Sequence, residues 1–216
     1  KDIYFCTKAQ IVWTPMDIEP LTGGCHFNNG CEKFHISCDN CPQLEKGRRN
    51  DISKQILNNK KKHLENVPIT VVACSSSVEQ WIRKSVLFKD NRIEKIFLGI
   101  DKSIFKNIKK DLARKILNLP KNNKLILFGC FNLDDPRKGG SLLVESLNEL
   151  NNSNYKDKPI IVTIGRKNRF KFSSIPFENI HLGLINDDRI LSLLYNAVDV
   201  VTVPSIDDAG PMIVSE

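Results

Sequence analysis

The chain has 216 residues, of which 41% are hydrophobic and 26% charged, as expected for one large or two small globular domains. No apolar run approaches the ~18 residues of a membrane span, and the first residues lack the pattern of a signal peptide. The formal net charge of +7 is compatible with nucleic acid, an acidic membrane surface or a phosphorylated ligand as partner.

The first half of the chain is predicted to alternate strands and helices. A short strand at 11–14 leads into a loop that contains Asp17, and the segment 21–44 is too polar and too rich in turn residues for a regular element. The patterns that follow predict, in order, a helix at 51–66, a strand at 69–74, a helix at 77–88 and a strand at 92–100. We expect Lys60, Lys61 and Lys62 to form a solvated face of the first of these helices.

The second half repeats this alternation after a junction near Asp101 to Ile108, which divides the chain into domains of residues 1–104 and 105–216. A charged helix follows the junction, and the later elements are strands at 124–132, 158–165, 178–185 and 198–205 and helices at 139–151 and 187–197. Continuous Val, Ile and Leu runs alternating with helices predict an α/β fold with doubly wound parallel sheets. Ligands of such sheets bind at the carboxyl ends of strands, which selects the loops 14–17, 134–140, 163–168 and 204–211.

The last of these loops leads into PSIDDAGPMIVSE, where Pro211 is suited to a first helical position. Free N–H groups near Met212 would then form an anion site suited to a phosphate. Asp208 and Glu216 are expected to flank one pocket, with Glu216 accepting hydrogen bonds from hydroxyl groups. Alternatively, the aspartates only cap the helix and Glu216 is a surface residue.

The loop DDPRKGG places Arg137 and Lys138 after a strand and before a helix, an arrangement that suits a diphosphate. A charged turn without a ligand is the alternative. Arg166, after the next strand, either reaches the same ligand or lies on the surface.

Four of the seven cysteines lie in the segment 21–44, with the spacing Cys-x5-Cys-x6-Cys-x2-Cys. This spacing suits a tetrahedral zinc site with Cys25, Cys31, Cys38 and Cys41 as ligands, and four protein ligands would make such a site structural. His26 or His35 could replace a thiol, or could pack or cap locally. Two local disulfides, free thiols and an iron–sulfur cluster remain alternatives.

The other cysteines suggest a reducing compartment. Cys74 and Cys130 fall in apolar runs and are expected to be buried, reduced thiols.

Taken together, the two C-terminal loops resemble those of retaining glycosyltransferases of family 4, which have the GT-B fold. The matching residues are a Lys-Gly pair at Lys138 and Gly139, and a Pro-Ser strand end followed by an acidic residue, seven residues and Glu, as in Pro204, Ser205, Asp208 and Glu216. The segments YNAVDVVTVPS and LGIDKSIF are similar to family segments as well. The family more often has Glu where this chain has Asp208.

A subgroup that builds bacterial capsule, exopolysaccharide or lipopolysaccharide chains carries a cysteine segment similar to TGGCH and CPQL of this chain. The subgroup usually has His where this chain has Met16, which leaves Asp17 as the polar candidate in that loop.

The resemblance implies two Rossmann-like domains, both incomplete, in a piece of a longer protein. Residues 1–104 would be the later part of the acceptor-side domain, with residues 21–44 as a Cys-rich insert, and residues 105–216 would be the first part of the nucleotide-sugar-binding domain. The implied reaction transfers a sugar from a nucleoside-diphosphate sugar to a hydroxyl of a growing bacterial surface glycan, with retention at the anomeric carbon.

The resemblance also implies the site. Catalytic candidates are Asp17, Arg137, Lys138 and Asp208, and donor-binding candidates are Gly23, Gly24, Lys138, Gly210, Pro211, Met212 and Glu216. Thr22 belongs to the same turn as Gly23 and Gly24. No catalytic metal is expected, and the partners would be the donor and a glycan or lipid-linked acceptor, without nucleic acid. Such a protein would be cytoplasmic, with peripheral contact at the inner membrane surface as a further expectation.

A different class of protein is also compatible with the charge and the four cysteines. A zinc-ribbon module that binds nucleic acid needs only ~40 residues with a basic and aromatic surface. The βαβ pattern and phosphate-type loop of the C-terminal half favour the enzyme.

Overall fold

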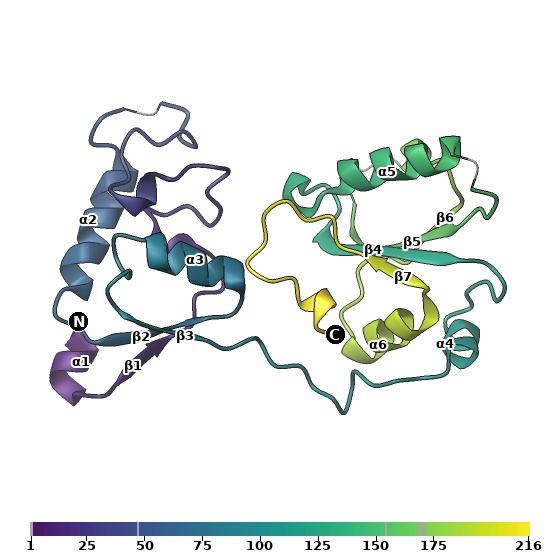
Figure 1. Cartoon of the computed structure of the whole chain (residues 1–216), viewed down its shortest axis with the longest axis horizontal. Helices are drawn as coiled ribbons and strands as arrows, with labels where there is room; N and C mark the ends of the chain where they lie inside the picture. The colour runs from purple at the N-terminus through teal and green to yellow at the C-terminus, as the bar shows by residue number, and fades with distance from the viewer. Residues whose placement is uncertain (1, 47, 154, 168, 170–171) are drawn as a thin grey trace. The chain divides into compact units, whose positions relative to one another are not determined.

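A computed structural model describes residues 2–46, 48–153, 155–167, 169 and 172–216 of the chain (Figure 1). The chain forms two compact units, Lys1–Leu98 and Gly99–Glu216. Each unit contains a parallel β-sheet with helices between its strands, so the predicted α/β fold with parallel sheets is confirmed. Within the described residues, no helix combines the length and the apolar character that crossing a membrane requires.

The first unit has a three-stranded parallel sheet with β2 in the centre, between β1 and β3. Asp51 and Ser75 cap the two helices that connect these strands, because each side chain accepts hydrogen bonds from backbone N–H groups of the first turn. The strands are β1 (Ile11–Trp13), β2 (Ile69–Ala73) and β3 (Arg92–Lys95), and the helices are α1 (Asp2–Thr7), α2 (Ile52–Leu64) and α3 (Ser76–Lys84).

The second unit has a four-stranded parallel sheet in the order β6-β5-β4-β7. Helix α5 covers one face of this sheet, and α4 and α6 cover the other (Figure 1). The strands are β4 (Leu125–Asn132), β5 (Ile160–Arg166), β6 (Asn179–His181) and β7 (Val200–Thr202), and the helices are α4 (Lys110–Ile116), α5 (Gly140–Asn152) and α6 (Asp188–Ala197).

Both faces of the second sheet are buried, which explains the continuous apolar sequence of its strands. In β4, Leu125 and Leu127 pack with Leu194 of α6, whereas the next residue, Phe128, packs with Leu143 of α5. Successive side chains therefore enter opposite cores, as the two-residue period of a strand requires.

Several predicted elements are shorter than expected. The predicted strand 92–100 ends at Lys95, and the next two apolar residues, Ile96 and Phe97, are exposed. The strands predicted at 178–185 and 198–205 have three residues each. The helix predicted after Pro211 is a single 3-10 turn, Met212–Val214. A single helical turn restricts the backbone of several residues but gains few hydrogen bonds. It is therefore only weakly stable by itself.

Arg114 on α4 connects distant parts of the second unit and is almost fully buried. Its guanidinium donates hydrogen bonds to the carbonyls of Pro120, Lys121, Asn123 and Ala197. It also forms a 2.8 Å ion pair with Asp199, just before β7. Helix α4, the loop before β4 and the start of β7 are thereby held by one side chain.

Candidate functional site

The two charged loops of the second unit lie against each other, because β4 and β7 are neighbours in the sheet. Lys138 donates a hydrogen bond to Asp208 across the loops. The backbone N–H of Ile206 donates to the carbonyl of Arg137 at 2.7 Å. The structure thus brings the Lys138 and Asp208 candidates, which are far apart in sequence, into direct contact.

Gly139 makes this contact between the loops possible. Its φ of 72° is left-handed, and a Cβ atom at this position would lie 2.0 Å from the carbonyl oxygen of Pro204. A residue with a side chain would therefore be strained in its backbone and would also force the two loops apart.

Gly139→Ala is expected to destabilise the second unit and to disorder the loop pair. Gly183→Ala is the matched control, because Gly183 has the same φ of 72° but open space around its Cβ position. In both variants the left-handed conformation should lower the free energy of unfolding by about 1 kcal/mol. In Gly139→Ala the clash with Pro204 should lower it further. Urea unfolding measures the difference. Equal losses in the two variants would contradict the close approach.

Arg137 is held at the base of its own loop. Its backbone N–H and guanidinium both donate to the carboxylate of Asp135, at 3.0 and 2.5 Å. The neighbouring loop contributes Asp207. Its pKa is raised overall, because burial and the charge of Asp208 together outweigh the lowering effect of Arg137. Two cations and three carboxylates therefore meet at this strand edge.

Glu216 has a partner that the sequence did not suggest. Its carboxylate accepts a 2.7 Å hydrogen bond from the hydroxyl of Tyr195 on α6. Burial raises the pKa of Tyr195, and the hydrogen bond to Glu216 and the negative charge of that residue raise it further, so the hydroxyl stays a donor. Phe105 stacks on the Tyr195 ring at 6.2 Å, and these residues border a cavity of about 310 Å³.

A second cavity, of about 250 Å³, opens at the carboxyl ends of β4 and β5. Its walls are mostly apolar and include Tyr195, which also lines the first cavity. The other residues of its wall include Cys130, Phe131, Gly165, Leu184, Ile185 and Ile213. The rule that ligands bind at strand ends could have selected this region, but the individual wall residues carry no sequence motif.

Two further predictions concern this edge of the sheet. Arg166 is exposed and its guanidinium lies over the Phe131 ring at 4.8 Å, so it borders the wall of the second cavity. The end of the predicted loop 163–168, Asn168, lies outside the described residues. Burial raises the pKa of the half-buried Cys130 to about 11, which keeps this thiol protonated near neutrality.

Asp17, in the first unit, is engaged in local structure. One carboxylate oxygen accepts a 2.7 Å bond from the backbone N–H of Glu19, and the other lies 2.7 Å from Nδ1 of His26. His26 is thus a partner of Asp17, and His35 packs edge-on against Phe34. Both histidines thus make local contacts, which was one of the two expectations for them; the other was to replace a cysteine as a metal ligand.

The turn that contains Thr22, Gly23 and Gly24 packs against the cysteine segment and α2. Thr22 is fully buried, and its hydroxyl donates to the carbonyl of Cys25. A Cβ atom on Gly23 would lie 2.2 Å from the carbonyl oxygen of Ser53, so this glycine permits the close packing. Gly24 is exposed, with a φ of 115°.

Lys60 corrects a prediction. It was expected on a solvated face, but its ammonium group donates to the carbonyls of Glu19 and Thr22 and pairs with the Glu19 carboxylate at 2.6 Å. Lys61 and Lys62 are exposed, as expected. A lysine on α2 therefore fixes the turn after β1, which local periodicity could not reveal.

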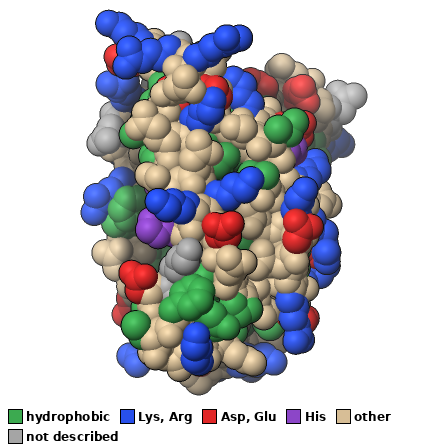
Figure 2. Space-filling model, turned by 90° about the vertical axis from the view of Figure 1, so that its left-hand side faces the viewer, with side chains coloured by type: hydrophobic (Ala, Val, Ile, Leu, Met, Phe, Trp, Pro, Cys, Tyr) green, Lys and Arg blue, Asp and Glu red, His purple; other side chains and the backbone are tan. Residues whose placement is uncertain are grey.

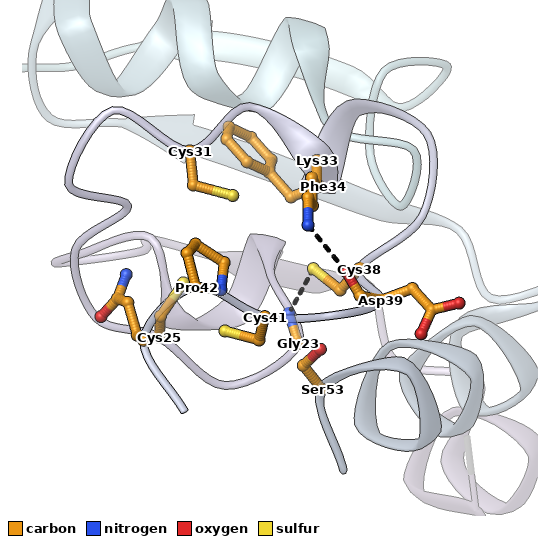
Figure 3. Close-up of a pocket in the computed structure, with 11 residues that line it drawn as sticks. Gly23, Cys25, Cys31, Lys33, Phe34, Cys38, Asp39, Cys41, Pro42 and Ser53 are labelled. Atoms are coloured by element: carbon orange, nitrogen blue, oxygen red, sulfur yellow. Dashed lines mark hydrogen bonds between the residues drawn. The ribbon is translucent and has the colours of Figure 1, made fainter. Parts of the chain in front are cut away.

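The four cysteines of the segment line one small cavity, shown in Figure 3. All seven cysteines lie in the described part of the chain and are free thiols. Burial raises the pKa of Cys25 and of Cys38, and both are raised further by the other thiols of the group. As the described side chains stand, no three His, Cys, Asp or Glu residues are arranged so that they could hold a metal ion.

The sequence matches no protein-family model and no curated protein. The structure is similar to sucrose-phosphate synthase from Thermosynechococcus elongatus, with a TM-score of 0.62 and 20% identity over 94% of this chain and 46% of that one. It is also similar to WaaG, a glycosyltransferase involved in lipopolysaccharide biosynthesis, with a TM-score of 0.60 and 17% identity over 94% of this chain and 52% of that one. The chain thus shares the GT-B fold of these proteins and spans about half of their length.

Proposed function

We propose that this chain is part of a retaining glycosyltransferase of the family 4 type that uses a nucleoside-diphosphate sugar as donor. The observation that carries the proposal is the contact between the loop of Lys138 and the loop of Asp208 at the carboxyl edge of the second sheet. Cations and carboxylates meet there, and the same unit contains two cavities that share Tyr195, a combination that suits a ligand with a base, a diphosphate and a sugar.

Lys138 is the proposed partner of the diphosphate. A leaving diphosphate gains negative charge as the bond to the sugar breaks, and a fixed ammonium group stabilises that charge. Asp208 holds Lys138 in place and accepts hydrogen bonds from hydroxyls of the transferred sugar. Arg137, fixed by Asp135, adds positive charge, and the turn at Gly210, Pro211 and Met212 adds the backbone N–H of Met212, since the N–H of Gly210 donates to Asp208.

Glu216 is the proposed partner of the ribose hydroxyls, with Tyr195 orienting its carboxylate. The apolar cavity at the ends of β4 and β5 is the proposed place of the nucleobase, because planar rings bind favourably between apolar walls. No metal ion is part of the proposed donor site, and Lys138 and Arg137 are its proposed cations.

The assignment of the two halves belongs to the same proposal. Residues 105–216 would bind the nucleotide sugar and residues 1–104 would serve the acceptor. Asp17 belongs to the acceptor part, as do Gly23 and Gly24, which would approach the donor from there. The proposed acceptor is a hydroxyl of a bacterial surface glycan or of a lipid-linked precursor, at the cytoplasmic face of the membrane. The cysteine segment supports this by its resemblance, and WaaG, which has a similar fold, is involved in lipopolysaccharide biosynthesis.

Ligand titration tests the proposal directly. UDP, GDP and their common sugar conjugates, and in parallel a short DNA and a short RNA, are added to the chain and unfolding is followed by heating. A ligand at 100 times its dissociation constant stabilises by about 2.7 kcal/mol, which is readily measured. We expect one nucleotide series to raise the melting temperature.

The nucleic acids provide the contrasting outcome. Stabilisation by DNA or RNA without any response to nucleotides would overturn the proposal and favour the nucleic-acid-binding alternative. A response to one nucleotide series alone would also identify the donor base.

A further inference from the structure

We propose that Cys25, Cys31, Cys38 and Cys41 bind one Zn²⁺ ion, which fixes the segment between β1 and α2. This proposal rests on the first unit alone and does not depend on the proposed donor site. Residues 23–44 of this segment have few buried apolar side chains, Phe34 being the main one. A segment of this kind needs another source of stability.

The cavity between the four thiols has the size of a single ion or water molecule. Its volume is about 30 Å³, and its wall is almost entirely apolar apart from sulfur. Cys25, Cys31, Cys38 and Cys41 all line this space, as Figure 3 shows. A water molecule in such a space would need polar partners, whereas thiolates suit a soft metal ion.

Other donors near the cavity are already engaged. The Asp39 carboxylate pairs with Lys54 at 3.0 Å and accepts the N–H of Asn50 at 2.7 Å. His26 is bonded to Asp17, and His35 packs on Phe34. The four sulfurs therefore form the donor set, and a tetrahedral site of four thiolates is typical of structural zinc.

Half of the set is preorganised. Lys33 donates to the carbonyls of Asp39 and Asn40 at 3.0 and 2.6 Å and so shapes the turn between Cys38 and Cys41. The N–H of Gly23 donates to the sulfur of Cys38 at 3.2 Å, which fixes the position of this sulfur. The N–H of Cys41 is held by Asp51, the cap of α2.

The other half must move a little, because the thiols as they stand do not converge to ligand distances. Cys25 and Cys31 are joined by an exposed turn at Asn29 and Gly30, where a Cβ on Gly30 would meet nothing within 4 Å. The proposal therefore requires these thiols to rotate and this turn to shift on metal binding, so that all four sulfurs reach one ion. Because no ligand position stays open, the ion acts structurally.

Metal analysis tests the proposal on the whole chain purified with reductant and without chelator. We expect one zinc per chain, and we expect Co²⁺ substitution to give the visible absorption bands of tetrahedral thiolate coordination. Chelation of the metal under native conditions should expose four additional thiols to a thiol reagent. Donor-site ligands should bind before and after chelation, since they belong to the other unit.

Variants separate the cluster from other cysteines. Cys38→Ser should abolish stoichiometric Co²⁺ binding, whereas Cys6→Ser, at an exposed position outside the cluster, should leave it unchanged. Should Cys38→Ser fail to fold, Co²⁺ titration of the unaltered chain still decides the matter. Two disulfides, an iron–sulfur cluster, or zinc-free protein whose four thiols react freely without chelator would each overturn the proposal.

Discussion

If the proposed donor site is correct, Lys138→Met weakens binding of a nucleoside diphosphate by about 10-fold to 100-fold. A charge-assisted hydrogen bond contributes about 1.5–3 kcal/mol, and every 1.4 kcal/mol corresponds to a factor of ten in affinity. Lys138 is only partly exposed, and its ammonium group is fixed by Asp208, so little of this interaction is lost to side-chain disorder. Isothermal titration with the nucleotide that stabilises the chain measures the effect.

Two variants control this experiment. Lys158→Met removes an exposed lysine at the opposite end of β5 and should leave affinity unchanged. Asp208→Asn should bind the diphosphate without a sugar at least as well as the parent, because it frees the positive charge of Lys138, but should bind the nucleotide sugar less well. Unchanged affinity in Lys138→Met would contradict the proposed diphosphate site.

Arg114→Met is expected to lower the free energy of unfolding of the second unit by about 3–5 kcal/mol, because it leaves several carbonyls without their donor and removes the buried cation from Asp199. Lys110→Met removes the other cation from Asp199. Because Lys110 is half exposed, this substitution should lower the free energy of unfolding by less than about 1 kcal/mol. Equal losses in the two variants would contradict the role of burial.

The positions of the tryptophans make this measurement specific to one unit. Both tryptophans, Trp13 and Trp81, lie in the first unit, so their fluorescence should report an unchanged transition in Arg114→Met. Circular dichroism, which detects the helices of both units, should show a second transition at lower urea concentration.

The same ion pair predicts a pH dependence. Burial raises the pKa of Asp199, but hydrogen bonds from Lys110 and from the N–H of Leu125, with the charges of Lys110 and Arg114, lower it to about 2. Because the folded pKa lies below the usual 3.8, the carboxylate stabilises the fold fully above pH 5 and loses this contribution as the pH falls through 4 toward 2. The stability difference between the parent and Asp199→Asn should narrow in that window.

Local patterns in the sequence were sufficient for the elements with long apolar runs. β4 and β5 follow from continuous Val, Ile and Leu, and α6 from its periodic apolar residues and its cap at Asp187. The ends of β3, β6 and β7 were overestimated, because apolar residues beyond a strand's hydrogen-bonded part look the same in sequence as those within it.

For the candidate site, the sequence selected the loops but not the contacts. Lys138, Asp208 and Glu216 were named from their residue types and spacing. Tyr195, the partner of Glu216, was missed, because a tyrosine on an amphipathic helix has the same periodicity whether its hydroxyl is bonded or free. Lys60 was misjudged for the same reason.

The α/β class, the two charged loops and the grouping of four cysteines could be predicted, because each depends on residues that are close along the chain. Which loops meet became apparent only from the folded arrangement of the strands. The strand order β6-β5-β4-β7 places the first and last strands of the second unit side by side, and so brings Lys138 to Asp208 and Arg114 to Asp199. Pairing across 70 and 85 residues depends on how strands pack against helices, which no local pattern encodes.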